Sequence, residues 1–144
     1  MSFSIDTNIL VYASDQDSPF QTAAARFLDT AVQETDVFFL AWPVIFGYLR
    51  IVTHPSILGN PLTPRDAELN IERLLSFPSV RVLLGNEEVW RTYRRISSEL
   101  IVRGDFVSDA YLAALLRHHG VTVLYTNDSD FRKFPFLEVR NPFR

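Results

Sequence analysis

The sequence lacks cysteine altogether, and this absence excludes several classes of site at once. Disulfide bonds, thiolate zinc sites and catalytic cysteine nucleophiles all require that residue. No apolar run approaches the ~20 residues that a helix needs to cross a bilayer. The first residues carry no basic segment ahead of their apolar positions, so we expect no signal peptide. Together these absences predict a soluble, cytoplasmic protein with no membrane partner.

Lysine is nearly absent as well: the sequence has one lysine, Lys133, and 13 arginines. The 14 basic and 17 acidic side chains give a formal net charge of −3. That balance argues against a protein that binds nucleic acid by bulk electrostatics alone. It does not exclude a nuclease, whose site must itself be acidic to hold a metal. The length of 144 residues and the 47% hydrophobic content predict a single domain over 1–144.

Short apolar runs alternate with longer helical patterns along the chain. Strands are expected at 3–5, 37–40, 80–84, 121–125 and near 137–139. Helices are expected at 18–31, 42–52, 63–75, 86–102 and 108–119. Apolar strands separated by helices predict an α/β fold, a three-layer α/β/α sandwich with a central parallel β-sheet. Ligands of such sheets bind beyond the carboxyl ends of the strands, where several acidic residues are expected.

Four aspartates are candidates for this edge. Asp6 directly follows the first strand, Asp109 lies in the first turn of an expected helix, and Asp128 and Asp130 follow the fourth strand. Each also has a structural interpretation: Asp6 as a helix cap, Asp109 as a first-turn acid behind a Ser108 cap, and Asp128 and Asp130 as parts of a polar loop. Taken together, these aspartates from distant parts of the chain predict one acidic site.

Carboxylates packed together repel one another unless a divalent cation compensates their charge. Oxygen ligands favour Mg²⁺ or Mn²⁺ over zinc. His118 and His119 lie near a predicted helix end, where they suit the helix dipole better than metal ligation. A hard cation held by carboxylates is a common means of activating water against a phosphodiester.

Several motifs now point to one family. They are Asp6-Thr7-Asn8-Ile9-Leu10, Leu49-Arg50-Ile51-Val52-Thr53-His54-Pro55, Pro61-Leu62-Thr63-Pro64, Val107-Ser108-Asp109-Ala110-Tyr111-Leu112-Ala113-Ala114, Thr126-Asn127-Asp128-Ser129-Asp130-Phe131 and Asn141-Pro142. In this order and spacing the chain resembles the PIN-domain ribonucleases, specifically the VapC-type toxins of bacterial toxin–antitoxin pairs. The resemblance covers essentially the whole chain and implies a metal-dependent endoribonuclease.

The resemblance also implies roles for individual residues. Asp6, Asp109 and Asp128 match the catalytic and metal-binding acidic positions, and Asp130 is a frequent companion at the metal. Supporting roles fall to the residues beside them, namely Thr7, Asn8, Asp105 and Thr126. Arg50 is a candidate contact for RNA phosphate, with a helix-end ion pair as the equally reasonable alternative.

The implied partners are an RNA substrate, with tRNA and rRNA as candidates, a cognate antitoxin and a second copy of the chain in a homodimer. Trp42, Phe46 and Tyr48 are candidates for the two protein contacts. Arg91, Arg94 and Arg95 share one helical face, but nearby glutamates favour an ordinary solvated surface over an RNA track.

One position departs from the family pattern. The resemblance leads us to expect a Glu three residues before Arg50, and Gly47 stands there. The departure predicts weakened metal binding, for which Asp105 or Asp130 would have to substitute. It also leaves an alternative open, a catalytically weakened PIN-like module that binds RNA or protein.

Overall fold

Strand β1 (Ser2–Ile5) is the centre of a five-stranded sheet in the computed structural model, which describes residues 1–144. The strand order is β3-β2-β1-β4-β5, and every neighbouring pair is parallel. The other strands are β2 (Val37–Ala41), β3 (Val80–Leu83), β4 (Val123–Tyr125) and β5 (Glu138–Arg140). All five carboxyl ends therefore meet at one edge of the sheet.

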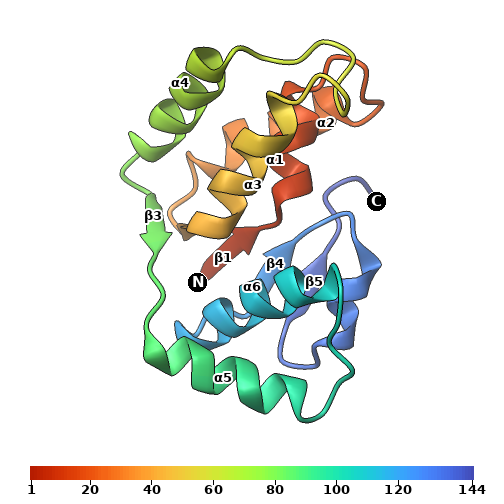
Figure 1. The fold of residues 1–144 in the computed structure, drawn as a ribbon. Helices are drawn as coiled ribbons and strands as arrows, with labels where there is room; N and C mark the ends of the chain where they lie inside the picture. The colour runs from red at the N-terminus through yellow and green to blue at the C-terminus, as the bar shows by residue number, and fades with distance from the viewer.

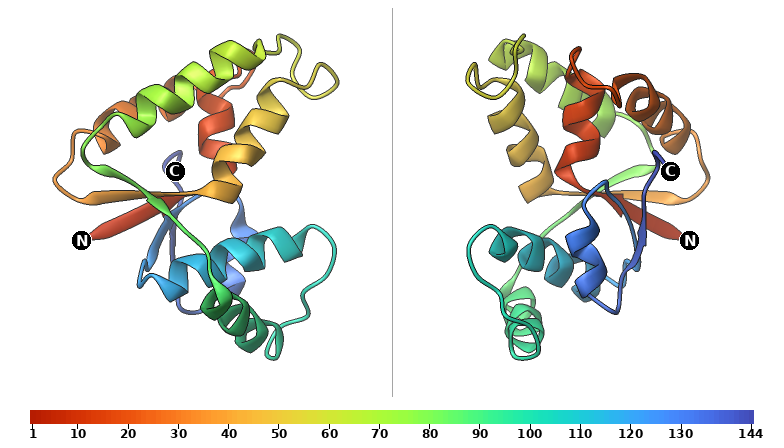
Figure 2. Two further views of the ribbon diagram at one scale, coloured as in Figure 1. Left: turned by 60° about the vertical axis from the view of Figure 1, so that its left-hand side comes forward. Right: turned by 90° about the vertical axis from the view of Figure 1, so that its right-hand side faces the viewer.

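Helices cover both faces of this sheet (Figures 1 and 2). One face carries α1 (Thr7–Ser14), α2 (Gln21–Ala31), α3 (Trp42–Val52) and α4 (Pro64–Leu75). The other carries α5 (Glu87–Ser97), α6 (Phe106–His118) and the short 3₁₀ helix η1 (Ser129–Lys133). The three-layer α/β/α architecture expected from the sequence is thus confirmed. No helix is long and apolar enough to cross a membrane.

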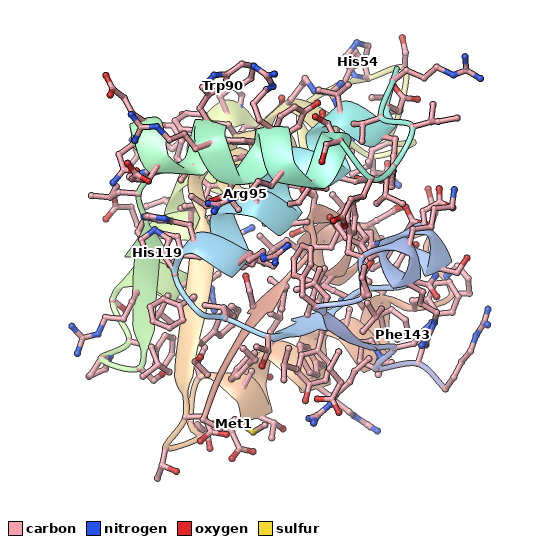
Figure 3. The ribbon with its side chains drawn as sticks, turned by 90° about the horizontal axis from the view of Figure 1, so that it is seen from below. Met1, His54, Trp90, Arg95, His119 and Phe143 are labelled. Carbon is pink, nitrogen blue, oxygen red and sulfur yellow. The ribbon has the colours of Figure 1, made fainter.

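Helix α6 lies close to the sheet because its inner face is made of small side chains. Ala110, Ala113 and Ala114 are fully buried, as is Ile5 of the central strand. At the far end of α6, Nε2 of His119 donates a hydrogen bond to the Leu84 carbonyl oxygen after β3 (2.8 Å; Figure 3). This packing fixes the first turns of α6 beside the carboxyl ends of β1 and β4.

Three helix starts differ from the sequence-based expectation. Helix α1 was not expected as a helix: it begins directly after Asp6, whose carboxylate accepts a 2.7 Å hydrogen bond from the Thr7 amide. Helix α2 begins at Gln21 instead of 18, because the Ser18 hydroxyl accepts from the Phe20 amide within a turn (3.1 Å). Helix α6 begins at Phe106, so Ser108 lies inside it and is not its cap.

Candidate metal centre

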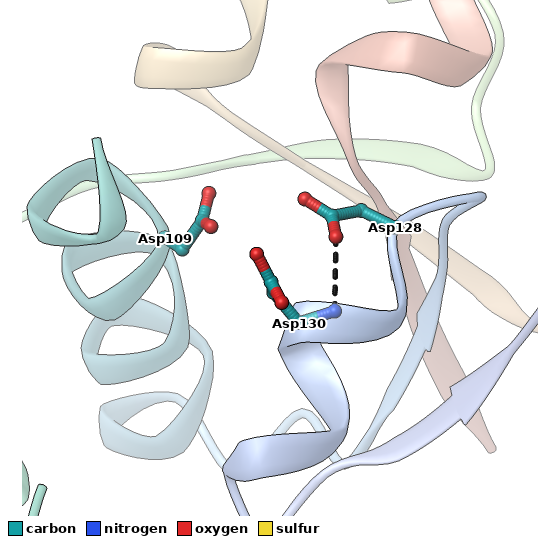
Figure 4. A group of neighbouring side chains, drawn as sticks. All are labelled: Asp109, Asp128 and Asp130. Carbon is teal, nitrogen blue, oxygen red and sulfur yellow. Dashed lines mark hydrogen bonds between the residues drawn. The ribbon is translucent and has the colours of Figure 1, made fainter.

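Three carboxylates converge at the carboxyl edge of the sheet. Asp109 projects from the first turn of α6, and Asp128 and Asp130 come from the junction of β4 and η1 (Figure 4). One oxygen from each lies within 4.8 Å of the others. The Asp130 amide donates a 2.9 Å hydrogen bond to Asp128 Oδ1, which holds the two loop aspartates in a fixed relation. The sequence-based prediction placed these side chains together, and the structure does so.

Asp6 joins the site through Thr126, which is 1% exposed. The Thr126 hydroxyl donates to Asp6 Oδ2 (2.9 Å) and accepts from the Asp128 amide (2.9 Å) and from the side-chain amide of Asn8 (3.2 Å). A single buried hydroxyl therefore links the end of β1, the start of α1 and the loop after β4. Because all of its hydrogen-bonding capacity is used within the site, Thr126 orients the acidic groups around it.

Burial, together with the crowding of negative charge, raises the pKa of two of these acids. The pKa of Asp109 rises from 3.8 to about 7, first because of burial and then because of the charges of Asp6, Asp128, Asp130 and Asp105. Burial also raises the pKa of Asp6, although hydrogen bonds from Thr126 and Thr7 oppose the rise. Each added negative charge makes ionisation of Asp109 harder, so the site favours a bound positive charge.

No side chain of the protein supplies that charge to the inner acids. The salt bridges of the molecule include one from Lys133 to Asp130, with the two atoms 3.6 Å apart on the surface, and none to Asp6, Asp109 or Asp128. A cluster of oxygen ligands without a cationic partner suits a hard divalent cation such as Mg²⁺ or Mn²⁺.

The other residues that the sequence predicted for the site differ in how they contact this centre. Thr7 and Asn8 contact it through hydrogen bonds, the first by its backbone amide and the second by its side chain. Asp105 is exposed at the start of α6 and contributes its charge to Asp109. Arg50 is exposed on the last turn of α3 and forms no salt bridge or hydrogen bond with the acids. The structure thus brings Arg50 into no contact with the site.

Sequence analysis missed a second layer of contacts behind the loop after β4. The Asn127 side chain donates to the Tyr12 hydroxyl (3.2 Å) and accepts from the Asn141 side-chain amide (2.7 Å). Phe143 then stacks on Phe20, with ring centroids 4.7 Å apart. The Asn141-Pro142 motif was a visible signal of this layer, but its spacing from Asn127 carries no periodicity that would reveal the contact.

Gly47 faces the first residue of α1. A Cβ built on Gly47 would lie 3.2 Å from Thr7 Oγ1 and 3.3 Å from Thr7 Cγ2. The glycine therefore allows α3 to approach α1 closely, at the place where the family pattern leads us to expect a Glu. The departure noticed in the sequence is also a packing feature of the structure.

The PIN domain model matches residues 4–137. The chain belongs to the PIN domain family. Among PIN-domain relatives, Ribonuclease VapC48 of Mycobacterium tuberculosis is 42% identical over 143 residues, covering 99% of both proteins. Ribonuclease VapC43 of the same organism is 29% identical over 138 residues, covering 96% of this chain and 93% of its own. The resemblance inferred from the motifs is confirmed.

Solved PIN-domain structures share the fold. VapBC2 from Rickettsia felis, bound to a DNA fragment from its promoter, aligns with a TM-score of 0.71 at 17% identity, covering 98% of each chain. VapC20 of Mycobacterium tuberculosis, a toxin that cleaves the sarcin–ricin loop, aligns with a TM-score of 0.68 at 20% identity, covering 96% of this chain and 98% of its own. At these identities the likeness supports the architecture alone.

Proposed function

We propose that this protein is a divalent-metal-dependent endoribonuclease and the toxin of a toxin–antitoxin pair, with residues 1–144 acting as a single PIN domain. The full-length similarity to proteins named as VapC ribonucleases supports the activity. The observation that carries the proposal is the convergence of Asp109, Asp128 and Asp130 within 4.8 Å, beside Asp6 and without a cationic side chain on the inner acids. We propose a cytoplasmic location for the protein, because its proposed substrate is RNA.

The donor set fits Mg²⁺ or Mn²⁺, because it consists of carboxylate oxygens from converging elements. Asp109, Asp128 and Asp130 would hold the ion, with Asp6 completing the charge around it. When bound, the ion supplies an activated water and stabilises the negative charge that develops on the phosphoryl group.

The chain itself fixes the positions of these acids. Thr126 holds the Asp6 carboxylate through its hydroxyl, and the Thr7 amide holds the other oxygen of that carboxylate. The Asp130 amide in turn orients Asp128. Asp105, at the exposed start of α6, adds negative charge and does not replace a ligand. Of the two substitutes considered for the missing Glu, the geometry favours Asp130.

Gly47 favours a second candidate function. The site lacks the Glu that the family pattern leads us to expect at this position, and a protein with weaker metal binding would act as a module that binds RNA or a partner protein. The three carboxylates and their intact hydrogen-bond network support the nuclease over this alternative.

The deciding experiment compares cleavage of mixed tRNA and rRNA by purified protein, freed of antitoxin, in Mg²⁺, Mn²⁺ and EDTA. We expect cleavage with either metal, none in EDTA, and none from Asp109→Asn. Asp17→Asn, an exposed aspartate in the loop after α1, is the matched control and should cut like the parent. RNA binding with no cutting in any metal would instead support the module.

We propose that the antitoxin binds the groove between α1, α2, α3 and α4. This groove encloses about 280 Å³ and is lined mainly by apolar side chains, among them Leu10, Leu28 and Leu74. Tyr48 lies at its base, 2% exposed, and its hydroxyl accepts from the Asn70 side-chain amide (3.0 Å). A partner with an amphipathic helix matches such a surface.

We propose a homodimer through a different surface, where aromatic side chains are exposed. Trp42 and Leu84 directly follow Ala41 and Leu83, which are paired in neighbouring strands. The patch continues through a cavity of about 650 Å³ that Trp90 and Tyr111 line. Trp42 and Trp90 are 40% and 60% exposed, which is unusual for such large apolar groups on a free surface. Figure 3 shows Trp90 on the outer side of α5.

A further inference from the structure

A further cavity, of about 570 Å³, adjoins the acidic site on the side of the edge strand β5. Its walls come from the β4–η1 junction, from β5 and from the residues after β5. Only two of its ten lining residues are hydrophobic. Three arginines, Arg132, Arg140 and Arg144, contribute to its wall, and we name it the arginine cavity. Nothing in the carboxylate chemistry described above accounts for it.

The arginines carry more positive charge than their surroundings neutralise. Arg140 is paired with Glu138 (2.7 Å) and donates to the Tyr125 hydroxyl (3.2 Å). Arg132 and Arg144 form no side-chain hydrogen bond and no salt bridge. Two guanidinium groups with unused donors, beside a third that is held in place, match the planar, bidentate geometry of a phosphate group.

Asp128 connects the cavity with the acidic site, because it belongs to both. It is one of the three converging carboxylates, and it also lines the arginine cavity. An RNA strand with one phosphodiester at the carboxylates must continue away from them on either side. On the side of Asp128 its path meets a polar cavity whose unpaired charges have the opposite sign to the RNA backbone.

The cavity is built from fixed elements. The Asn127 side chain lies in its wall, held by Tyr12 on one side and by Asn141 on the other. Phe143 stacks against Phe20 of the N-terminal half, which anchors the segment that carries Arg144. These contacts hold the backbone that carries the arginines, so binding does not first have to order that backbone, which lowers the cost of binding.

We propose that the arginine cavity binds the RNA backbone phosphate next to the one that is cleaved. Arg132 and Arg144 contact this phosphate, and Arg140 closes the wall behind it. The assignment rests on the proposed ribonuclease function and adds to it the path of the substrate. Phosphate contacts of this kind position the strand without reading its sequence.

The test measures binding of a fluorescein-labelled single-stranded RNA by anisotropy in EDTA, so that the RNA is not cut. Salt is varied between about 50 and 200 mM. We expect Arg132→Gln with Arg144→Gln to weaken binding about tenfold and to flatten the slope of log K against log[salt] by about 0.7, since both arginines contact the same phosphate and one lost phosphate contact removes about 0.7 on single strands.

Two controls accompany this variant. Arg81→Gln removes an exposed arginine from β3, the opposite edge strand, and should leave affinity and slope unchanged. Arg132→Lys with Arg144→Lys keeps the charge and should keep the slope while losing part of the affinity, because lysine lacks the bidentate fork. Thermal melting of every variant separates loss of binding from loss of folding.

The outcomes are distinct. If the folded double Gln variant keeps the affinity and the salt slope of the parent, the arginine cavity does not bind the RNA backbone, whether or not the parent cleaves RNA. If the parent cuts RNA in Mn²⁺ while this variant binds RNA normally, the proposed ribonuclease activity stands and only the proposed role of the cavity is contradicted. A parent that neither binds nor cuts RNA overturns both.

Discussion

Gly47 lies against the side chain of Thr7, so that an added Cβ would come within 3.2 Å of Thr7 Oγ1. Helices α1 and α3 meet here, one residue beyond Asp6. The contact exists because glycine brings no side chain to it. Any larger residue at position 47 must displace Thr7, whose amide holds the Asp6 carboxylate.

We therefore expect Gly47→Ala to lower the free energy of unfolding by about 1 kcal/mol. Overpacking at a close contact costs about 1–3 kcal/mol, and the better helix propensity of alanine offsets only part of it. In a Thr7→Ala background the same change should be neutral or stabilising. Denaturant unfolding of the four proteins measures this coupling. Equal effects of Gly47→Ala in both backgrounds would show that the contact is unimportant.

Thr126→Val tests the buried hydroxyl that joins the acidic elements. Valine has nearly the same shape, but it cannot donate to Asp6 or accept from the Asp128 amide. We expect a loss of about 1–3 kcal/mol in stability and loss of metal-dependent cleavage. Thr126→Ser keeps the hydroxyl and should retain most of the activity. If the valine variant bound Mn²⁺ as tightly as the parent, Thr126 would not orient the ligands.

The raised pKa of Asp109 makes the stability of the metal-free protein depend on pH. The folded protein binds this proton more tightly than the unfolded chain does, so the free energy of unfolding falls as pH rises from about 4 to about 7. Because Asp109 is only half-buried, solvent screening reduces the effect to about 1–2 kcal/mol. Urea unfolding in EDTA across this range measures it. Asp109→Asn should flatten the dependence and be the more stable protein above pH 7.

The same proton competes with the metal. Below about pH 7, binding of Mn²⁺ must displace a proton from Asp109, so apparent affinity should rise up to about tenfold per pH unit and level off above that value. Isothermal titration in buffers of different ionisation enthalpy counts the protons released. Affinity that stays constant from pH 5 to 8 would contradict a ligand role for Asp109.

The exposed aromatic patch predicts the oligomeric state. Sedimentation should show a dimer for the parent protein and a monomer for Trp42→Ser combined with Trp90→Ser. Leu69→Ser is the matched control, because Leu69 is 52% exposed on α4 and does not line the cavity that Trp90 lines. A monomeric parent, or a dimer that withstands the double substitution, would place the interface elsewhere.

Sequence reasoning succeeded where periodicity and topology determine position. Apolar strands alternating with helices predict parallel strands whose carboxyl ends coincide, and this brings Asp6 and Asp128 to one edge. Asp109 joins them because the small alanines of α6 let that helix lie close to the sheet. Sequence reasoning failed where a few local hydrogen bonds determine the residue at which a helix begins. The start of α2 depends on one hydrogen bond, from the Phe20 amide to the Ser18 hydroxyl, which forms a turn ahead of the helix. In the sequence, Ser18 looks equally suitable as the N-cap of a helix that begins directly after it.

The layer behind the site was hidden for a different reason. Asn127 meets Tyr12 and Asn141 through side chains from three separate segments, and no spacing along the chain encodes such a meeting. Helix α1 was missed because Asp6-Thr7-Asn8 reads equally as a turn, a cap or a catalytic motif. The structure shows that Asp6 caps α1 and also faces the acidic cluster.

Asp6 and its hydrogen-bond partner Thr126 are 120 residues apart in sequence, although β1 and β4 are neighbours in the sheet. During synthesis, the ribosome makes Asp6 long before it makes Thr126 and Asp128. The carboxylates cannot assemble until that late segment has emerged and β4 has paired with β1. A nascent chain of this protein therefore carries no assembled site until the segment with Thr126 and Asp128 has left the ribosome.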